Sequence, residues 1–140
     1  MLTEKELLAQ PSSEYMSDDQ LAFFQSILVN KMKSINERIR DSKSSLQVER
    51  NSDVSDTASV EESRTLGLNI AQRDNQELAR INKALTMIAE GEYGYCLDSG
   101  EEIGLKRLIA VPESLFSVES MRAIEAKQQH QRSGGMGSSF

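Results

Sequence analysis

The chain has 140 residues, a length typical of one domain rather than two. It carries 16 Lys and Arg residues against 22 Asp and Glu residues, a formal net charge of −6. Because duplex DNA and RNA binders need basic side chains to displace counterions, this balance argues against a general nucleic-acid-binding protein. Only 5% of the residues are aromatic and Trp is absent, which argues against a large core. The composition instead favours apolar stripes between long helices, or partial disorder.

The cysteine and hydropathy patterns bear on the compartment. The single cysteine, Cys96, allows no intramolecular disulfide and is typical of a reducing compartment, so we expect a cytoplasmic protein. No apolar run approaches the roughly 18 residues that a membrane-spanning helix needs. Residues 1–10 are charged and contain no apolar stretch typical of a signal peptide. The sequence therefore predicts no membrane association.

A long helix is predicted after a polar N-terminal segment. Residues 1–16 are expected to be mobile, with at most a short helix around Glu4 to Ala9. The helix begins after Ser17, which can form a capping box with Gln20. Its apolar residues recur in steps of three and four, as in a heptad stripe. They are Leu21, Phe24, Leu28, Met32, Ile35, Ile39 and Leu46.

A second helix of similar length follows a tight reversal. Residues 51–57 are rich in Asn, Ser and Asp, which favour turns and caps. We expect the second helix to begin near residues 56–59 and to end at Gly91, a suitable left-handed cap. Its stripe consists of Leu68, Ala71, Leu78, Ile81, Leu85 and Ile88. Residues 17–91 therefore predict an antiparallel coiled-coil hairpin, about 45–50 Å long, with its tip near residues 51–58.

The character of the sequence changes after the hairpin. Three glycines, Gly94, Gly100 and Gly104, punctuate a short segment that predicts a turn-rich module or a small hairpin. A further helix is expected from Leu115 to about Gln131, and residues 92–132 together form the predicted globular module. Residues 133–140 read as a flexible Gly- and Ser-rich tail. The predicted fold class is mainly α.

Several motifs occur together in a fixed order. Residues 91–108 contain Gly-Glu-Tyr-Gly-Tyr-Cys, then Gly-Glu-Glu-Ile and Arg-Leu. The triplet Glu-Tyr-Met occupies residues 14–16, and Asp53, Asp56 and Ala58 lie in the predicted turn. Over residues 14–131 this pattern resembles the DksA family of bacterial transcription factors. The resemblance implies a coiled-coil hairpin with a small zinc-finger-like module and a C-terminal helix.

The metal site of that family is degenerate here. The zinc-binding form of the family has two Cys-x-x-Cys pairs, which fall in this sequence on Cys96 and Ser99 and on Ser117 and Ser120. Structural zinc needs four good donors, and a neutral serine hydroxyl is a poor one. The lone His130 cannot replace three ligands. We therefore expect a module without zinc and no other cofactor.

Two interpretations stay open for the remaining thiol and for the acidic pair. Cys96 is either a small, half-buried core residue or a redox-active thiol, although no activating neighbour is visible in the sequence. Asp56 can cap the second helix and Asp53 can close an Asx turn. The resemblance implies instead that Asp53, Asp56 and Ala58 form a tip placed in the secondary channel of RNA polymerase, near its catalytic centre.

The resemblance also implies a site for ppGpp at the polymerase interface. Arg80 matches a basic position of the family on the second helix, whereas Val111 and Met121 replace basic residues. Three other basic residues are candidate interface contacts: Lys106, Arg107 and Arg122. Since two phosphate contacts are missing, we expect a reduced response to ppGpp.

The resemblance thus implies a regulator that acts on transcription initiation, within the stringent response, by binding RNA polymerase and not specific DNA. The sequence contains no nucleophile–base pair, phosphate loop or complete metal set, so no enzyme is predicted. Three alternatives remain. The chain could be a passive helical adaptor, a redox sensor that uses Cys96, or a factor that stimulates transcript cleavage, as the similarly shaped Gre factors do.

Overall fold

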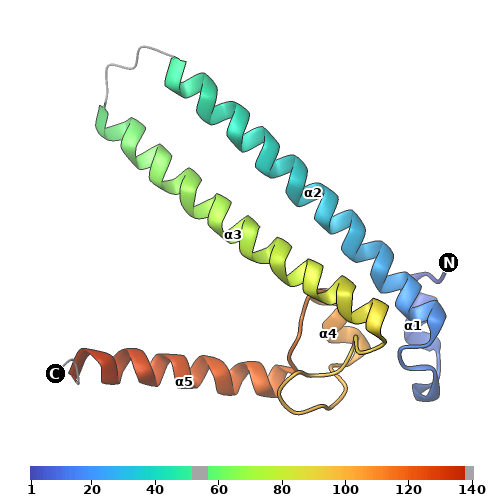
Figure 1. Ribbon diagram of the computed structural model, residues 1–140. Helices are drawn as coiled ribbons and strands as arrows, with labels where there is room; N and C mark the ends of the chain where they lie inside the picture. The colour runs from blue at the N-terminus through green and yellow to red at the C-terminus, as the bar shows by residue number, and fades with distance from the viewer. Residues whose placement is uncertain (52–56, 138–140) are drawn as a thin grey trace.

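The computed structural model describes the backbone of residues 1–51 and 57–137, and the side chains of residues 1–43 and 60–130. The elements follow in the order α1 (Glu4–Ala9), a 3-10 turn η1 (Ser12–Glu14), α2 (Asp18–Asn51), α3 (Thr57–Glu90), α4 (Leu105–Ala110) and α5 (Val118–Gly137). Figure 1 shows α2 and α3 antiparallel and side by side, with the small elements gathered at their base and α5 leaving the base in another direction. The predicted hairpin architecture is confirmed.

The two long helices begin and end where their capping residues predict. The amide of Gln20 donates to Ser17 Oγ at 3.4 Å, while Gln20 Oε1 accepts from the amide of Met16 at 3.0 Å. The second bond reaches one residue further back than in a standard capping box. At the other end, Gly91 has φ +76°, and the amides of Gly91 and Glu92 donate to Ile88 and Met87. This is the Schellman pattern, which glycine adopts without strain.

The seam between α2 and α3 differs in phase from part of the predicted stripe. Ile81 is fully buried, and Leu85 and Ile88 pack against the core, as predicted. Leu68 is 59% exposed, so its assignment to the seam is wrong. Counting back in heptads from Ile81 gives Asp74 and Gly67 as seam positions, and Leu68 lies one residue out of phase. The apolar stripe was misleading because a charged residue occupies the seam.

The hydrophobic core lies at the base of the hairpin, where the short elements meet the long ones. Tyr93 is 1% exposed, and its hydroxyl donates to the carbonyl of Pro112 at 2.6 Å, while burial raises the pKa of the phenol. Its ring lies 5.6 Å from that of Phe24. The buried apolar residues are Leu7, Phe23, Phe24, Leu28, Ile35, Ile81, Ala84, Met87, Tyr93, Cys96, Ile103 and Leu108.

The N-terminal segment belongs to this core, which corrects the expectation of a mobile arm. Leu7 on α1 is fully buried, because the six-residue helix presents it to the module. Tyr15 also anchors the segment: its hydroxyl donates to Gly94 O at 2.6 Å and accepts from the amide of Gly104 at 3.0 Å. Burial raises the pKa of this phenol despite the bond from Gly104.

The module is the small turn-rich unit that the glycines predict. A single antiparallel bridge joins Tyr95 and Glu102, and four glycines have positive φ. A Cβ added to Gly94 would lie 2.6 Å from Met16 Cγ, so this position requires glycine for space as well as for φ +97°. Helix α5 continues to Gly137, past the predicted end at Gln131 and into the segment 133–140 that was expected to be a flexible tail. Among the described residues, no helix is long and apolar enough to cross a membrane.

Candidate functional site

The four degenerate metal-ligand positions lie together in the module. Cys96 follows the bridge, Ser99 lies in the next turn, and Ser117 caps α5 by accepting from the amide of Ser120 at 3.2 Å. The Cys96 thiol lies 3.3 Å from Ser120 Oγ. The amide of Glu101 donates to Ser99 Oγ at 3.3 Å. The fold therefore brings both predicted pairs to one point, at the junction of the turns with the first turn of α5.

Cys96 has the activating neighbours that sequence reasoning missed. It is 3% exposed, so it is buried rather than half-buried. Burial by itself raises the pKa of the thiol, but hydrogen bonds from the hydroxyls of Ser120 and Ser99, and from the backbone of Ser117 and Ser99, lower it to about 6. The lowered pKa favours the thiolate, which is the reactive form of a redox cysteine, whereas burial restricts the access of an oxidant to it.

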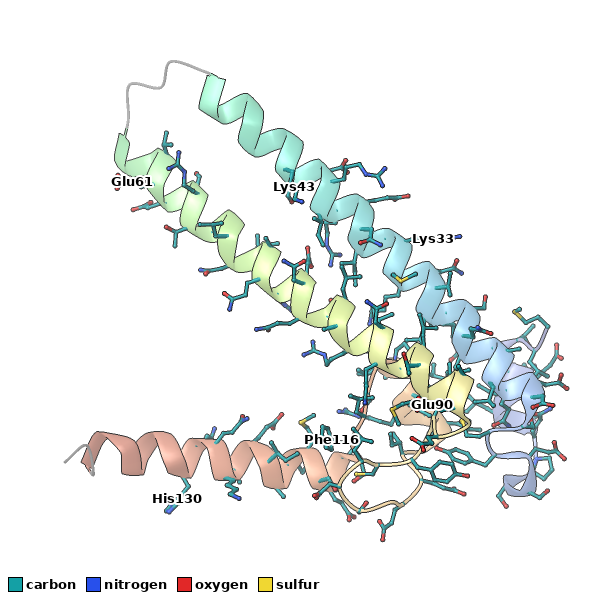
Figure 2. The ribbon with its side chains drawn as sticks, in the orientation of Figure 1. Lys33, Lys43, Glu61, Glu90, Phe116 and His130 are labelled. Carbon is teal, nitrogen blue, oxygen red and sulfur yellow. The ribbon has the colours of Figure 1, made fainter. Side chains whose placement is uncertain are left out.

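This donor set does not fit zinc. One thiol and three hydroxyls surround the point where four ligands would have to converge, and hydroxyls are weak zinc donors. Within the described residues, no group of three or more His, Cys, Asp or Glu side chains could hold a metal ion. His130 lies far along α5 from the module (Figure 2).

A second site is a groove of about 450 Å³ between α3, α4 and the start of α5. Arg80 and Arg107 line it, as do Val111 and Met121, so the structure brings together the residues predicted for ppGpp binding. Nε of Arg107 is buried and has no hydrogen-bond partner among the described side chains. Lys106 instead borders a separate hollow beside Leu8 and Tyr15. Arg122 is exposed on α5 and is not among the residues of either hollow.

The lining of the groove is amphipathic. Its other residues are Glu113, Ser114, Leu115, Phe116, Ile124, Glu125 and Gln128. Figure 2 places Phe116 where α5 joins the module, below the base of α3. The groove thus combines two guanidinium groups, two carboxylates and an apolar part, so an anion could pair with the arginines only beside Glu113 and Glu125. Val111 and Met121 contribute only apolar surface at the positions where the resemblance implied phosphate contacts.

The predicted tip cannot be placed in the same way. Asp53 and Asp56 lie outside the described residues. Ala58 belongs to α3, but its side chain is also outside them. What the structure gives is the frame: the described parts of α2 and α3 end at Asn51 and begin at Thr57, at the end of the hairpin far from the module.

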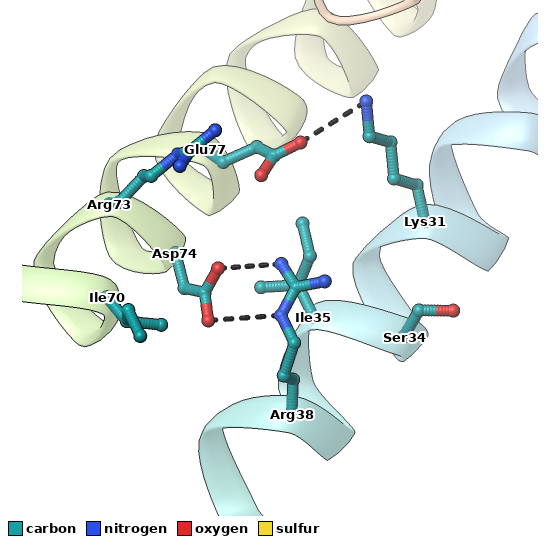
Figure 3. A pocket seen from close by; sticks show the side chains of 8 residues that line it. All are labelled: Lys31, Ser34, Ile35, Arg38, Ile70, Arg73, Asp74 and Glu77. Atoms are coloured by element: carbon teal, nitrogen blue, oxygen red, sulfur yellow. Dashed lines mark hydrogen bonds and ion pairs between the residues drawn. The ribbon is translucent and has the colours of Figure 1, made fainter. Parts of the chain in front are cut away.

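Two ionic contacts inside the hairpin were missed by sequence reasoning (Figure 3). Arg38 donates to both carboxylate oxygens of Asp74, at 3.2 and 2.6 Å. Lys31 Nζ lies 3.2 Å from Glu77 Oε1. They line a cleft of about 400 Å³ between α2 and α3. The signal was present, since Lys31 and Arg38 follow Phe24 at intervals of seven residues and so continue its seam position.

The comparisons with known proteins agree with this architecture. The family described as "DnaK suppressor protein DksA, N-terminal domain" matches residues 20–88. The RNA polymerase-binding transcription factor DksA of Caulobacter vibrioides is 35% identical over 88% of this chain and 89% of its own length. The Escherichia coli K12 protein of the same name is 29% identical over 86% of this chain and 81% of its own.

A solved structure extends the likeness to the whole fold. Transcription factor DksA2 from Pseudomonas aeruginosa superposes with a TM-score of 0.81 and 37% identity, covering 91% of this chain and all of that one. The match therefore includes the module and not the hairpin alone. The hairpin, the module with its four clustered ligand positions and the sequence identity lead to one conclusion: this chain belongs to the DksA family.

Proposed function

We propose that this protein regulates transcription by binding RNA polymerase, with its hairpin inserted through the secondary channel. The observation that carries the proposal is the pairing of a rigid, narrow hairpin with a module at its base, in a chain 35% identical to a polymerase-binding factor. Each 34-residue helix spans about 50 Å, which suits a probe for a deep, narrow passage. The tip, with Asp53, Asp56 and Ala58, then alters the stability of promoter open complexes through its charge.

The groove at Arg80 is proposed as the remnant of a ppGpp site. Arg80 and Arg107 supply two cations, while Val111 and Met121 supply none. Lys106 and Arg122 would then act as separate contacts to polymerase. On this basis, ppGpp acts as a weak co-effector and the main activity does not depend on it.

The module is proposed to work without zinc in the cytoplasm. Support comes from the donor chemistry at Cys96 and from the hydrogen bonds that hold its turns together. Such a module keeps its fold where zinc is scarce. We further propose that the chain has no catalytic role of its own.

The decisive experiment separates binding from effect. Purified RNA polymerase is assayed on a promoter with an unstable open complex, with the unmodified protein and with the Asp53→Asn, Asp56→Asn variant. Asparagine keeps the size and much of the capping capacity of aspartate but removes its charge. We expect the variant to compete for polymerase nearly as well as the unmodified protein and to lose most of the transcriptional effect.

The other outcomes favour the alternatives. Full activity of the double variant would remove the acidic tip from the mechanism. Binding without any effect of the unmodified protein would favour a passive adaptor. Loss of folding in the variant would mean that the two carboxylates only cap the hairpin, and circular dichroism measures this directly. Cleavage of stalled transcripts in the same assay would indicate Gre-like activity.

A further inference from the structure

Beside the shared core at its base, to which Leu28 of α2 and Met87 of α3 also belong, two contacts along α2 tie the hairpin to the module. The first is the buried contact between Phe24 and Tyr93, whose ring centroids lie 5.6 Å apart. The second is Lys31, two helical turns further on, whose Nζ lies 2.8 Å from each carboxylate oxygen of Glu113. The same Nζ lies 3.2 Å from Glu77 on α3. One ammonium group therefore joins α2, α3 and the module.

Glu113 is itself fixed to the module. It follows Pro112, whose carbonyl accepts the hydroxyl of buried Tyr93 at 2.6 Å, and its side chain is only 7% exposed. Burial alone would lower the pKa of Lys31, but the bonds to Glu113 and Glu77 outweigh it and raise this pKa. The ammonium thus stays charged, and the contact is a persistent link between the hairpin and the segment that joins α4 to α5.

The spacing of the two attachments turns them into an angular constraint. Seven residues separate Phe24 from Lys31, about 10 Å along the helix axis. From Phe24 to its end at Asn51, α2 extends roughly 40 Å. A rotation of about 10° around the Phe24 contact would therefore displace the far end of the hairpin by roughly 7 Å. A single attachment at the base permits such a rotation, and a second one further along α2 opposes it.

We propose that Lys31, held by Glu113, is a positioning residue that fixes the angle between the hairpin and the module. The tip then reaches its site while the module is docked on the same partner. The second half of this inference rests on the proposed function. The first half concerns the free protein and is tested without any partner.

The first experiment measures the angle in the free protein. Spin labels are attached at Lys43→Cys on α2 and Ala110→Cys on α4, both exposed positions, in a Cys96→Ser background. The test variant combines Lys31→Met with Glu113→Gln, which removes the charge of the 7% exposed Glu113 and leaves Glu77, whose side chain is 20% exposed, to the solvent. Because the contact with the module furthest along α2 is lost while the core at the base remains, we expect its distance distribution by pulsed electron paramagnetic resonance to become roughly twofold broader. Glu77→Gln alone is the control for loss of the ion pair between α2 and α3 and should leave the distribution narrow.

Two further controls accompany the test variant. Lys33→Met removes an exposed charge on the outer side of α2 (Figure 2) and should leave the distribution unchanged. Lys31→Arg keeps the charge and should preserve the narrow distribution. Circular dichroism verifies that every variant is folded. A test variant as narrow as Lys33→Met would overturn the proposal.

The second experiment measures the consequence for transcription. The test variant should need a roughly tenfold higher concentration for half-maximal effect on polymerase, since two parts no longer held at fixed geometry lose effective concentration. Lys31→Arg should restore the effect. A broadened distribution with unchanged potency would overturn the role of Lys31 in positioning the tip. Failure of the unmodified protein to bind polymerase would overturn the proposed function instead, and the distance measurement would still decide the structural half.

Discussion

The hydroxyl groups around Cys96 change the acidity of its thiol, and this change has a measurable effect on folding. The pKa falls from 9.0 to about 6 in the folded chain, so the folded state favours the thiolate. The stabilisation is complete above about pH 9 and disappears as the pH falls through about 6.

We therefore predict that the stability difference between the unmodified protein and Cys96→Ala grows with pH. The difference in free energy of unfolding should rise by up to about 1.4 kcal/mol per pH unit between pH 6 and 9. Denaturant titrations of both proteins at several pH values measure this difference. The ultraviolet absorbance of the thiolate, followed against pH, gives the pKa of Cys96 independently. Parallel pH profiles for the two proteins would contradict the lowered pKa.

The pair of Arg38 and Asp74 is asymmetric, because its two members differ in exposure. The side chain of Asp74 is 6% exposed, while that of Arg38 is 54% exposed. The pKa of Asp74 is lowered chiefly by its hydrogen bonds to Arg38. Removing Arg38 therefore leaves a buried carboxylate without its partner, whereas removing the charge of Asp74 leaves a guanidinium in solvent.

The predicted result is an unequal double-mutant cycle. Arg38→Met should lower the free energy of unfolding by about 3 kcal/mol, and Asp74→Asn by about 1 kcal/mol or less. The combination of Arg38→Met with Asp74→Asn should recover most of the loss, since no buried charge remains. Chemical denaturation of the four proteins measures the cycle. Equal costs for the two single variants would show that the exposure difference has no energetic role.

At the scale of elements, the turns around Cys96 and the first turn of α5 bring four ligand positions together, but three of them carry hydroxyls in place of thiols. We predict that Ser99→Cys, Ser117→Cys and Ser120→Cys together create a structural zinc site, because the fold already brings the four positions to one point. Elemental analysis after dialysis should find about one zinc per chain in the triple variant. The unmodified protein should retain less than about 0.2 equivalents.

Chelation provides the matching test. A strong chelator should lower the thermal midpoint of the zinc-loaded triple variant and leave that of the unmodified protein unchanged. Stoichiometric zinc in the unmodified protein would contradict the proposal of a zinc-free module. A triple variant that binds no zinc would mean that the serines lie too far apart to act as ligands.

The elements also differ in how well the sequence predicts them. The two long helices are specified by local features, since Ser17, Gln20 and Gly91 mark ends that heptad spacing connects. The short helix expected around Glu4 to Ala9 forms as α1, but helices of six residues, such as α1 and α4, are too short to be stable alone, so tertiary packing decides whether they are anchored. Leu7 looked like part of a polar tail for this reason. The ion pair between Lys31 and Glu113 spans 82 residues, a separation that no local pattern encodes.

At the scale of the whole molecule, the resemblance named candidate residues, but only some of them lie together in the fold. The resemblance identified the residues at the metal positions and the groove, and the fold brings Cys96 to Ser120 and Arg80 to Arg107. The resemblance also implied that Lys106 and Arg122 belong to the same interface, but neither side chain lines the groove. The direction in which a helical side chain points depends on how its helix is rotated against its neighbours, which the sequence does not give. The tip residues Asp53 and Asp56 remain a prediction.

We predict that basic residues restored to the groove strengthen the response to ppGpp. Val111→Arg with Met121→Lys would add two charge-assisted contacts, each worth about 1.5–3 kcal/mol. In a promoter assay with polymerase, the synergy between ppGpp and the double variant should rise roughly tenfold or more over that of the unmodified protein. Val111→Gln with Met121→Gln is the matched control without charge. A full ppGpp response of the unmodified protein would show that two cations suffice.

The composition of the module's core has a consequence for synthesis on the ribosome. Leu7 comes from before the hairpin and Phe24 from the start of its first helix, whereas Tyr93 and Leu108 come from after it. The first pair leaves the exit tunnel long before the second pair has been translated, so their apolar surface stays uncovered while the hairpin is being made. The two long helices can pair through contacts between neighbouring turns as they emerge. The core can be completed only after residues from distant parts of the chain have been translated. The base of the hairpin is thus the last part of the molecule to complete its core, and chaperone contacts with the nascent chain should concentrate on residues 7–28.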